Sequence, residues 1–327
     1  MLTWIDDTEI VLTHRRVDKV KLSNVYVSCD LENLTGSNKK EKELEYISSD
    51  LLIEKQGSYL ISGDEQQGKT SLLKNCFKEY SLKGYLCIYL DAKKISNSDI
   101  DECLRLEVAS QYDNLELSNL LNFENKILLI DNIDEIKLNA KYRSLFLEKA
   151  SVIFTNIIIT CNSSFKYITP EINELNSFEK YELLGLGHKK RAEIVEKWIS
   201  LGVEESIDER DLYEQCDDVK ERLDAIIRKN IVPPKPFYVL ILLQMFEAYA
   251  QQNLELTSHG HCYQQLVYQS FDNAGIPKNE IDMYLNVLTE LAWDIHLNND
   301  GLNNKQLTVF FDNYHEKYLS VNHEAII

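Results

Sequence analysis

The sequence predicts an α/β domain built on a parallel β-sheet, followed by an all-α helical region. Four short apolar runs recur between residues 58 and 161 and are separated by helix-like segments. The first run leads directly into a glycine-rich segment that ends in lysine and threonine. After Gly187 the strand signals disappear, and apolar residues recur at the three- and four-residue steps of helices. These three observations set the predicted fold class and the order of its parts.

The apolar runs are predicted to be strands of one parallel sheet. Each is short and continuously apolar, as expected of a strand that helices cover on both faces. The expected strands are 59–61, 86–90, 127–130 and 157–159, with a fifth at 181–184. Residues 1–45 mix short apolar stretches with a polar run over 35–42, which predicts a linker or an edge element ahead of this sheet.

Prolines mark the start of a helix in the C-terminal half. Pro233, Pro234 and Pro236 precede the apolar stretch 237–249. Proline fits the first turn of a helix but not its interior, so a helix is expected to begin here.

Composition and charge exclude several classes of protein. A net charge of −18 over 327 residues repels phosphate backbones, which argues against non-specific binding of nucleic acid or of anionic membranes. The seven cysteines show no CxxC spacing, which predicts reduced thiols rather than a zinc site or a disulfide framework. Neither a signal-peptide pattern nor an apolar run of membrane-spanning length is present. We therefore expect a cytoplasmic protein.

Residues 63–70 match the pattern GxxxxGK[ST] between an expected strand and an expected helix, the context that a phosphate-binding loop requires. The glycines allow a tight turn that points backbone N–H groups at a β-phosphate, and the following helix directs its positive end there. Lys69 is expected to bridge the β- and γ-phosphates as a catalytic residue, and the Thr70 hydroxyl to ligate Mg²⁺. The predicted nucleotide-binding residues of this segment are Gly63, Asp64, Glu65, Gln66, Gln67, Gly68, Lys69, Thr70 and Ser71.

A second motif places an acid at the end of a strand. The apolar run 127–130 is followed directly by Asp131. A carboxylate in this position is where a P-loop enzyme holds Mg²⁺ through water, so Asp131 joins Thr70 as a predicted metal residue. Together the two motifs predict a P-loop NTPase of the ASCE type.

The residues after Asp131 carry a resemblance to a known family. In most AAA+ ATPases a second acid directly follows the metal aspartate, but this chain has Asn132 there and acids at Asp134 and Glu135. This pattern resembles the STAND class of signal-transducing NTPases, which includes the NACHT and related bacterial defence families. The resemblance implies ATP or ADP as the nucleotide and a later acid that activates the attacking water. Asp134 is the first candidate for that role and Glu135 the second.

The resemblance implies two further nucleotide contacts. Asn162 follows the expected strand 157–159, where such proteins carry a sensor of the γ-phosphate, although relatives often have arginine nearby. Its alternative interpretation is a turn residue after a strand. Pro236 resembles the proline that packs near the adenine in this family, and its alternative is a helix-starting proline without ligand contact.

The same resemblance divides the chain into four parts. It implies an N-terminal segment or linker over residues 1–45, a P-loop NTPase domain over 46–187 and a small helical lid domain over 188–255. Residues 256–327 resemble a winged-helix-like region that is cut short.

As a function, the resemblance implies a slowly hydrolysing, ATP-dependent switch that controls self-association, with bacterial antiviral defence as its role. Effector and sensor domains or proteins would lie outside this chain. Two alternatives stay open. One is an AAA+ ATPase that acts on nucleic acid as a loader or transposition helper, and the other is a nucleotide-binding scaffold that does not hydrolyse.

Overall fold

The chain divides into two compact units, Met1–Leu254 and Glu255–Ile327. The computed structural model describes residues 3–34, 45–113, 115–167, 172–228, 232–250, 264, 267–268, 270–271, 274–297, 302 and 304–318. The polar run over 35–42 lies outside these residues, and so does Cys262. The domain boundaries expected from the sequence stay predictions.

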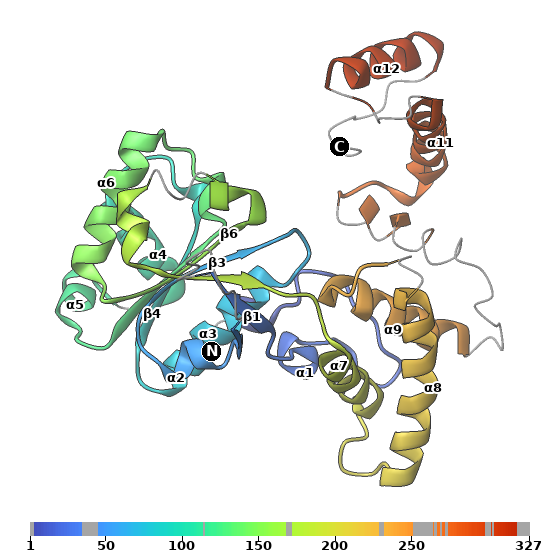
Figure 1. The fold of residues 1–327 in the computed structure, drawn as a ribbon, viewed down its shortest axis with the longest axis horizontal. Coiled ribbons are helices and arrows are strands. Elements are labelled where there is room, and N and C mark those ends of the chain that lie inside the picture. Colours follow the sequence, from blue (N-terminus) through green and yellow to red (C-terminus); the bar gives the residue numbers. More distant parts are fainter. Residues whose placement is uncertain are drawn as a thin grey trace, which may run out of the picture. The chain divides into compact units, whose positions relative to one another are not determined.

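The first unit is built on a seven-stranded sheet with the order β2-β1-β7-β3-β6-β5-β4 (Figure 1). Its strands are Asp30–Asn33 (β1), Tyr46–Ser48 (β2), Ser58–Gly63 (β3), Leu86–Asp91 (β4), Lys126–Asp131 (β5), Asn156–Asn162 (β6) and Glu179–Leu183 (β7). The strands from β3 to β7 pair in parallel and coincide with the five expected from the sequence. β6 lies between the loop-bearing strand β3 and the acid-tipped strand β5, as in the ASCE type. The predicted α/β fold class is confirmed.

The N-terminal region extends one edge of this sheet. Leu31 of β1 lies opposite Ile47 of β2 and Leu183 of β7, and both pairings are antiparallel. The region therefore supplies an edge element, one of the two alternatives expected for it. Short helices flank these strands, namely η1 (Thr3–Asp6), α1 (Leu22–Val25) and α2 (Leu51–Glu54).

Helices cover both faces of the sheet (Figure 1). Alternate residues of β3 enter different cores, since Tyr59 and Ile61 pack with α2 and α3 (Lys69–Leu82), whereas Leu60 packs on the opposite face. That opposite face carries α4 (Ile100–Gln111), α5 (Leu117–Asn122) and α6 (Ala140–Ile153). Because both faces are buried, the strands can be continuously apolar, which is the pattern that revealed them.

Two side chains next to the end of α4 bond the backbone of β4, the outer strand. Gln111 accepts from the Tyr89 N–H (3.0 Å) and donates to the Tyr89 carbonyl (2.6 Å). The Tyr112 hydroxyl accepts from the Cys87 N–H (3.2 Å) and donates to the Cys87 carbonyl (2.6 Å). These bonds tie β4 to the end of α4.

Three helices complete the first unit, namely α7 (His188–Ser200), α8 (Glu209–Arg228) and α9 (Pro236–Ala250). They pack against one another. The N-terminal region is bonded to two of them, because the Thr13 N–H donates to Gln244 of α9 (2.8 Å) and Lys197 of α7 donates to the Tyr26 carbonyl (2.6 Å). Short 3-10 helices connect other elements, namely η2 (Ala92–Lys94), η3 (Ile133–Glu135), η4 (Ser163–Tyr167) and η6 (Asn173–Ser177).

In the second unit the described residues form helices around a small apolar core. They include η7 (Lys278–Glu280), α11 (Ile281–Leu297) and α12 (Asn304–Lys317). Phe271, Val287 and Phe310 are among the residues buried between them. The winged-helix interpretation stays a prediction. No helix among the described residues of either unit combines the length and apolar character needed to cross a membrane.

Candidate functional site

The phosphate-loop segment connects β3 to α3, as its sequence predicts. Gly68 has a φ of +95°, a left-handed conformation that glycine adopts without steric cost. Gln66 is also left-handed, at +61°, although it carries a side chain. Strained backbone of this kind persists where surrounding contacts hold it, and such residues cluster at binding sites.

Gln67 fastens the loop to the sheet. Its side-chain carbonyl accepts from the Asp64 N–H (2.7 Å), and its amide nitrogen donates to the Leu183 carbonyl at the end of β7. The residue is only 8% exposed. The pattern GxxxxGK[ST] leaves this position free, so sequence reasoning grouped Gln67 with the other loop residues and missed its bonds to the strand.

Lys69 is folded back into the loop. Its ammonium donates to the carbonyls of Gly63 and Asp64, both at 2.8 Å. Burial lowers the pKa of Lys69, and the nearby carboxylates of Asp134 and Asp131 oppose that shift. The two carbonyl oxygens and the nearby carboxylates keep this buried ammonium charged. A phosphate would give it a charge-assisted hydrogen bond, which is stronger than a bond to a neutral carbonyl.

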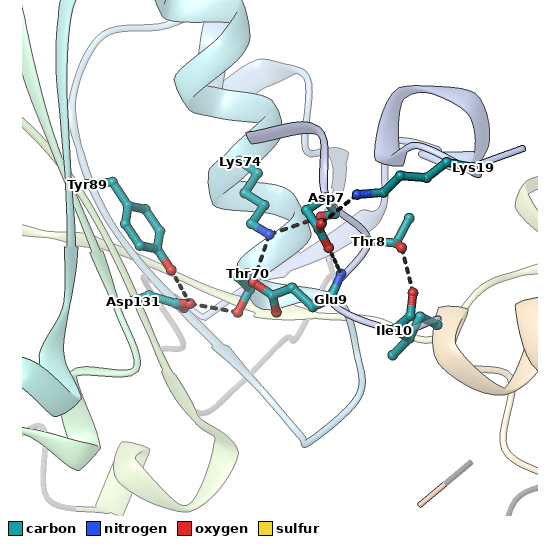
Figure 2. A network of polar contacts seen from close by, with 9 residues as sticks. All are labelled: Asp7, Thr8, Glu9, Ile10, Lys19, Thr70, Lys74, Tyr89 and Asp131. Carbon is teal, nitrogen blue, oxygen red and sulfur yellow. Dashed lines mark hydrogen bonds and ion pairs between the residues drawn. The ribbon is translucent and has the colours of Figure 1, made fainter. Parts of the chain in front are cut away.

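Asp131 is the most densely bonded side chain of the site. It is 2% exposed, and one carboxylate oxygen accepts from the hydroxyls of Thr70 (2.6 Å) and Tyr89 (2.9 Å), as Figure 2 shows. Its other oxygen accepts from the Thr160 hydroxyl at 2.5 Å, and that hydroxyl accepts in turn from the Asn132 N–H. Burial raises the pKa of Tyr89, and the charge of Asp131 and the hydrogen bond to it act in the same direction, so the phenol stays a donor. Neither Tyr89 nor Thr160 was expected at the site.

The two predicted metal residues, Thr70 and Asp131, are therefore in direct contact. Their oxygens come from a hydroxyl and a carboxylate, which are hard donors that Mg²⁺ accepts together with phosphate oxygens and water. A Thr70 hydroxyl turned to a metal ion would leave Asp131 close enough to accept from a metal-bound water. The donor set fits Mg²⁺.

The two candidate acids after Asp131 differ in their surroundings. Asp134 is partly buried, and its carboxylate accepts from the Asn162 N–H at 2.9 Å. Glu135 is exposed and pairs with Lys93 at 3.0 Å. The charge of Asp134 also raises the pKa of Lys69, which links Asp134 to the phosphate loop.

Asn162 ends β6 opposite Gly63, the first residue of the loop. Its side-chain carbonyl accepts from the N–H and the hydroxyl of Ser164, each at 3.0 Å. This oxygen therefore caps the turn into η4, while the Asn162 backbone contacts Asp134. Ser71 lies in the first turn of α3 and is half-buried.

The helical part of the first unit reaches the loop through the residues that begin α9. A Cβ atom built on Gly68 would lie 3.6 Å from the Pro236 ring, so Pro236 stands directly beside the loop. Lys235 donates to the Glu65 carbonyl (3.1 Å) and pairs with Asp64 (3.4 Å). The sequence predicts Pro236 as a residue of the site, but it does not predict Lys235.

Comparison with known proteins adds similarities of fold alone. The sequence matches no family model and no curated protein. Similar solved structures include RIF2 of Saccharomyces cerevisiae, with 14% identity, a TM-score of 0.38 and coverage of 65% of this chain and 84% of that one. Domain III of the replication initiation protein DnaA of Thermotoga maritima has 13% identity, a TM-score of 0.39 and coverage of 67% and 88%. The RuvB branch migration motor of the same organism has 12% identity, a TM-score of 0.33 and coverage of 61% and 66%. The order of the sheet and the loop between β3 and α3 themselves show that this chain has a P-loop ATPase-like fold.

Proposed function

We propose that this chain is a STAND-type molecular switch that binds ATP with Mg²⁺, hydrolyses it slowly and controls self-association through the bound nucleotide. One observation carries the proposal. At the carboxyl ends of the parallel strands, Thr70 at the start of α3 bonds Asp131 from β5, and the charges of Asp131 and of Asp134 from η3 raise the pKa of Lys69. Ligands of open α/β sheets bind at this end of the strands.

Each residue has a defined task in this proposal. Backbone N–H groups of the loop and the start of α3 would bind the β-phosphate. Lys69 would exchange its two carbonyl partners for phosphate oxygens. Thr70 and Asp131 would hold Mg²⁺, which neutralises charge that develops on the phosphates.

Asp134 is the proposed acceptor of the proton from the attacking water. The Asn162 N–H bonds one of its oxygens, which fixes the carboxylate while leaving its second oxygen for a water molecule. Glu135 is directed to Lys93 instead, which supports Asp134 as the first candidate.

The switch itself is proposed to run through α9. Lys235 and Pro236 contact the loop at Glu65 and Gly68, so a loop that rearranges around a γ-phosphate would change its contacts with this helix. Self-association, effector and sensor partners outside this chain, and a role in bacterial antiviral defence are proposed from the resemblance at Asn132 and Asp134.

The decisive experiment measures ATP binding and single-turnover hydrolysis on the same preparations. Lys69→Ala is expected to weaken ATP binding at least tenfold, because a charged phosphate contact is lost. Asp134→Asn keeps the oxygen that Asn162 bonds and removes the charge, so it should bind ATP normally and lose hydrolysis by about 100-fold or more. Glu135→Gln is the matched control and should hydrolyse normally.

The outcomes separate the alternatives. Normal hydrolysis by Asp134→Asn would remove Asp134 from its role. A wild-type chain that binds ATP and never turns it over would instead be the non-hydrolysing scaffold. Tight, salt-dependent DNA binding at physiological salt would favour the AAA+ alternative that acts on nucleic acid.

A further inference from the structure

Tyr89 contacts the Asp131 carboxylate from a strand that carries no part of the phosphate loop. Its hydroxyl donates to the same oxygen that accepts from Thr70 (Figure 2). If Thr70 turns to a metal ion, that bond to Asp131 is lost. The bond from Tyr89 can stay, because β4 and β5 keep their pairing up to Asp91 and Asp131.

The position of Tyr89 is fixed from two directions. Both its backbone groups bond to Gln111, which holds this point of β4. Its ring packs against Trp4 with the ring centroids 4.9 Å apart, and Trp4 in turn meets Phe77 of α3 edge to face at 5.5 Å. Aromatic contacts of this kind favour particular ring orientations.

The segment that carries Trp4 is fastened to the helix that begins at the phosphate loop. Lys74, one turn after Thr70, donates to the Asp7 carbonyl (3.0 Å) and pairs with Glu9 (2.8 Å), as Figure 2 shows. The Lys74 side chain is 4% exposed. Glu9 has a φ of +62°, a conformation that a residue with a side chain adopts rarely. These contacts hold η1 beside Tyr89.

We propose that Tyr89 is a positioning residue that orients the Asp131 carboxylate for the metal ion, and that Trp4 holds Tyr89 in place for this task. The inference rests on the proposed function, in which Asp131 serves Mg²⁺. A carboxylate bound by a fixed phenol keeps one orientation when Thr70 leaves it, so less free energy is spent on ordering it when the metal binds. The N-terminal segment is then part of the metal side of the site.

The test is a Mg²⁺ titration of nucleotide affinity, measured by calorimetry with a non-hydrolysable ATP analogue. Tyr89→Phe removes only the hydroxyl and keeps the ring against Trp4. The Mg²⁺ concentration that gives half of the maximal increase in nucleotide affinity should rise about tenfold. The nucleotide affinity measured in EDTA should change by less than about twofold, because only a bond to the metal carboxylate is lost.

The matched control removes the hydroxyl of another tyrosine that bonds β4. Tyr112→Phe removes the bonds to Cys87 and should leave the Mg²⁺ requirement unchanged, since Tyr112 does not touch Asp131. Trp4→Ala should reproduce the effect of Tyr89→Phe, and Trp4→Phe should restore most of the wild-type response by keeping an aromatic contact.

Each result decides the proposal. An unchanged Mg²⁺ requirement in Tyr89→Phe overturns it, and so does an equal rise in Tyr112→Phe, which would indicate general loosening of β4. A response in Tyr89→Phe but not in Trp4→Ala overturns the role of Trp4. If the wild-type chain binds no nucleotide at any Mg²⁺ concentration, the proposed function fails first and this inference falls with it.

Discussion

Replacing Gln67 by alanine is expected to lower the free energy of unfolding of the first unit by about 3 kcal/mol. The side chain makes two hydrogen bonds, to the Asp64 N–H and to the Leu183 carbonyl, and each contributes about 1 kcal/mol net. Leu183 is 1% exposed, so its carbonyl would lose a partner that water replaces poorly, which costs roughly 1 kcal/mol more. For a unit of this size the loss corresponds to a melting temperature lower by roughly 6–12 °C.

Urea denaturation followed by circular dichroism measures this loss, and two further variants make it specific. Gln67→Glu keeps the oxygen that accepts from Asp64 but offers Leu183 a second acceptor, so it should be at least as destabilising as alanine. Glu65→Ala changes an exposed side chain of the same loop and should stay within about 0.5 kcal/mol of wild type.

Equal stability of Gln67→Ala and Glu65→Ala would refute the reasoning, because it would mean that Gln67 does not fasten the loop. A Gln67→Glu variant more stable than Gln67→Ala would contradict the part assigned to Leu183.

Three further predictions concern other parts of the first unit. Thr160→Val keeps the shape of a fully buried side chain but removes a donor to the Asp131 carboxylate, so urea denaturation should show a loss of about 2–3 kcal/mol. Lys235→Ala should cost less than about 1 kcal/mol, because its pair with Asp64 is partly exposed, but it should speed hydrogen exchange of the loop amides measured by mass spectrometry. Burial lowers the pKa of His14 from 6.5, so the unfolded chain takes up the proton first and stability should fall as pH drops below about 6.5. The stability difference between wild type and His14→Gln should shrink over the same interval, and an unchanged difference would contradict this assignment.

The parallel strands could be predicted because their signal is local. The run 127–130 is apolar whichever neighbour it pairs with, since both faces of the sheet are covered. β1 and β2 give no such signal. Their residues are partly exposed, and Leu31 is the one buried residue among the seven. β1 is a strand because it pairs with β7, about 150 residues away along the chain, as in Leu31 with Leu183, and β2 pairs in turn with β1.

The candidate site shows the same division. Lys69, Thr70 and Asp131 stand in short patterns whose chemistry can be recognised from neighbours in sequence. Gln67 and Tyr89 act through partners that the fold brings to them, Leu183 in one case and Asp131 in the other. Gln67 stands at a position that the loop pattern leaves free, and Tyr89 is one residue of an apolar strand. Nothing in the neighbouring sequence indicates the partner of either residue.

The side chains bonded to β4 also limit how copies of this chain can meet. An outer strand with free backbone groups serves as a template on which a strand of another molecule can be added, and this route leads to aggregation. At Cys87 and Tyr89 the donors and acceptors of β4 are already taken by Tyr112 and Gln111. A second copy could add a strand here only after both side chains had been displaced. Assemblies of this chain are therefore not expected to form by extending the sheet at β4.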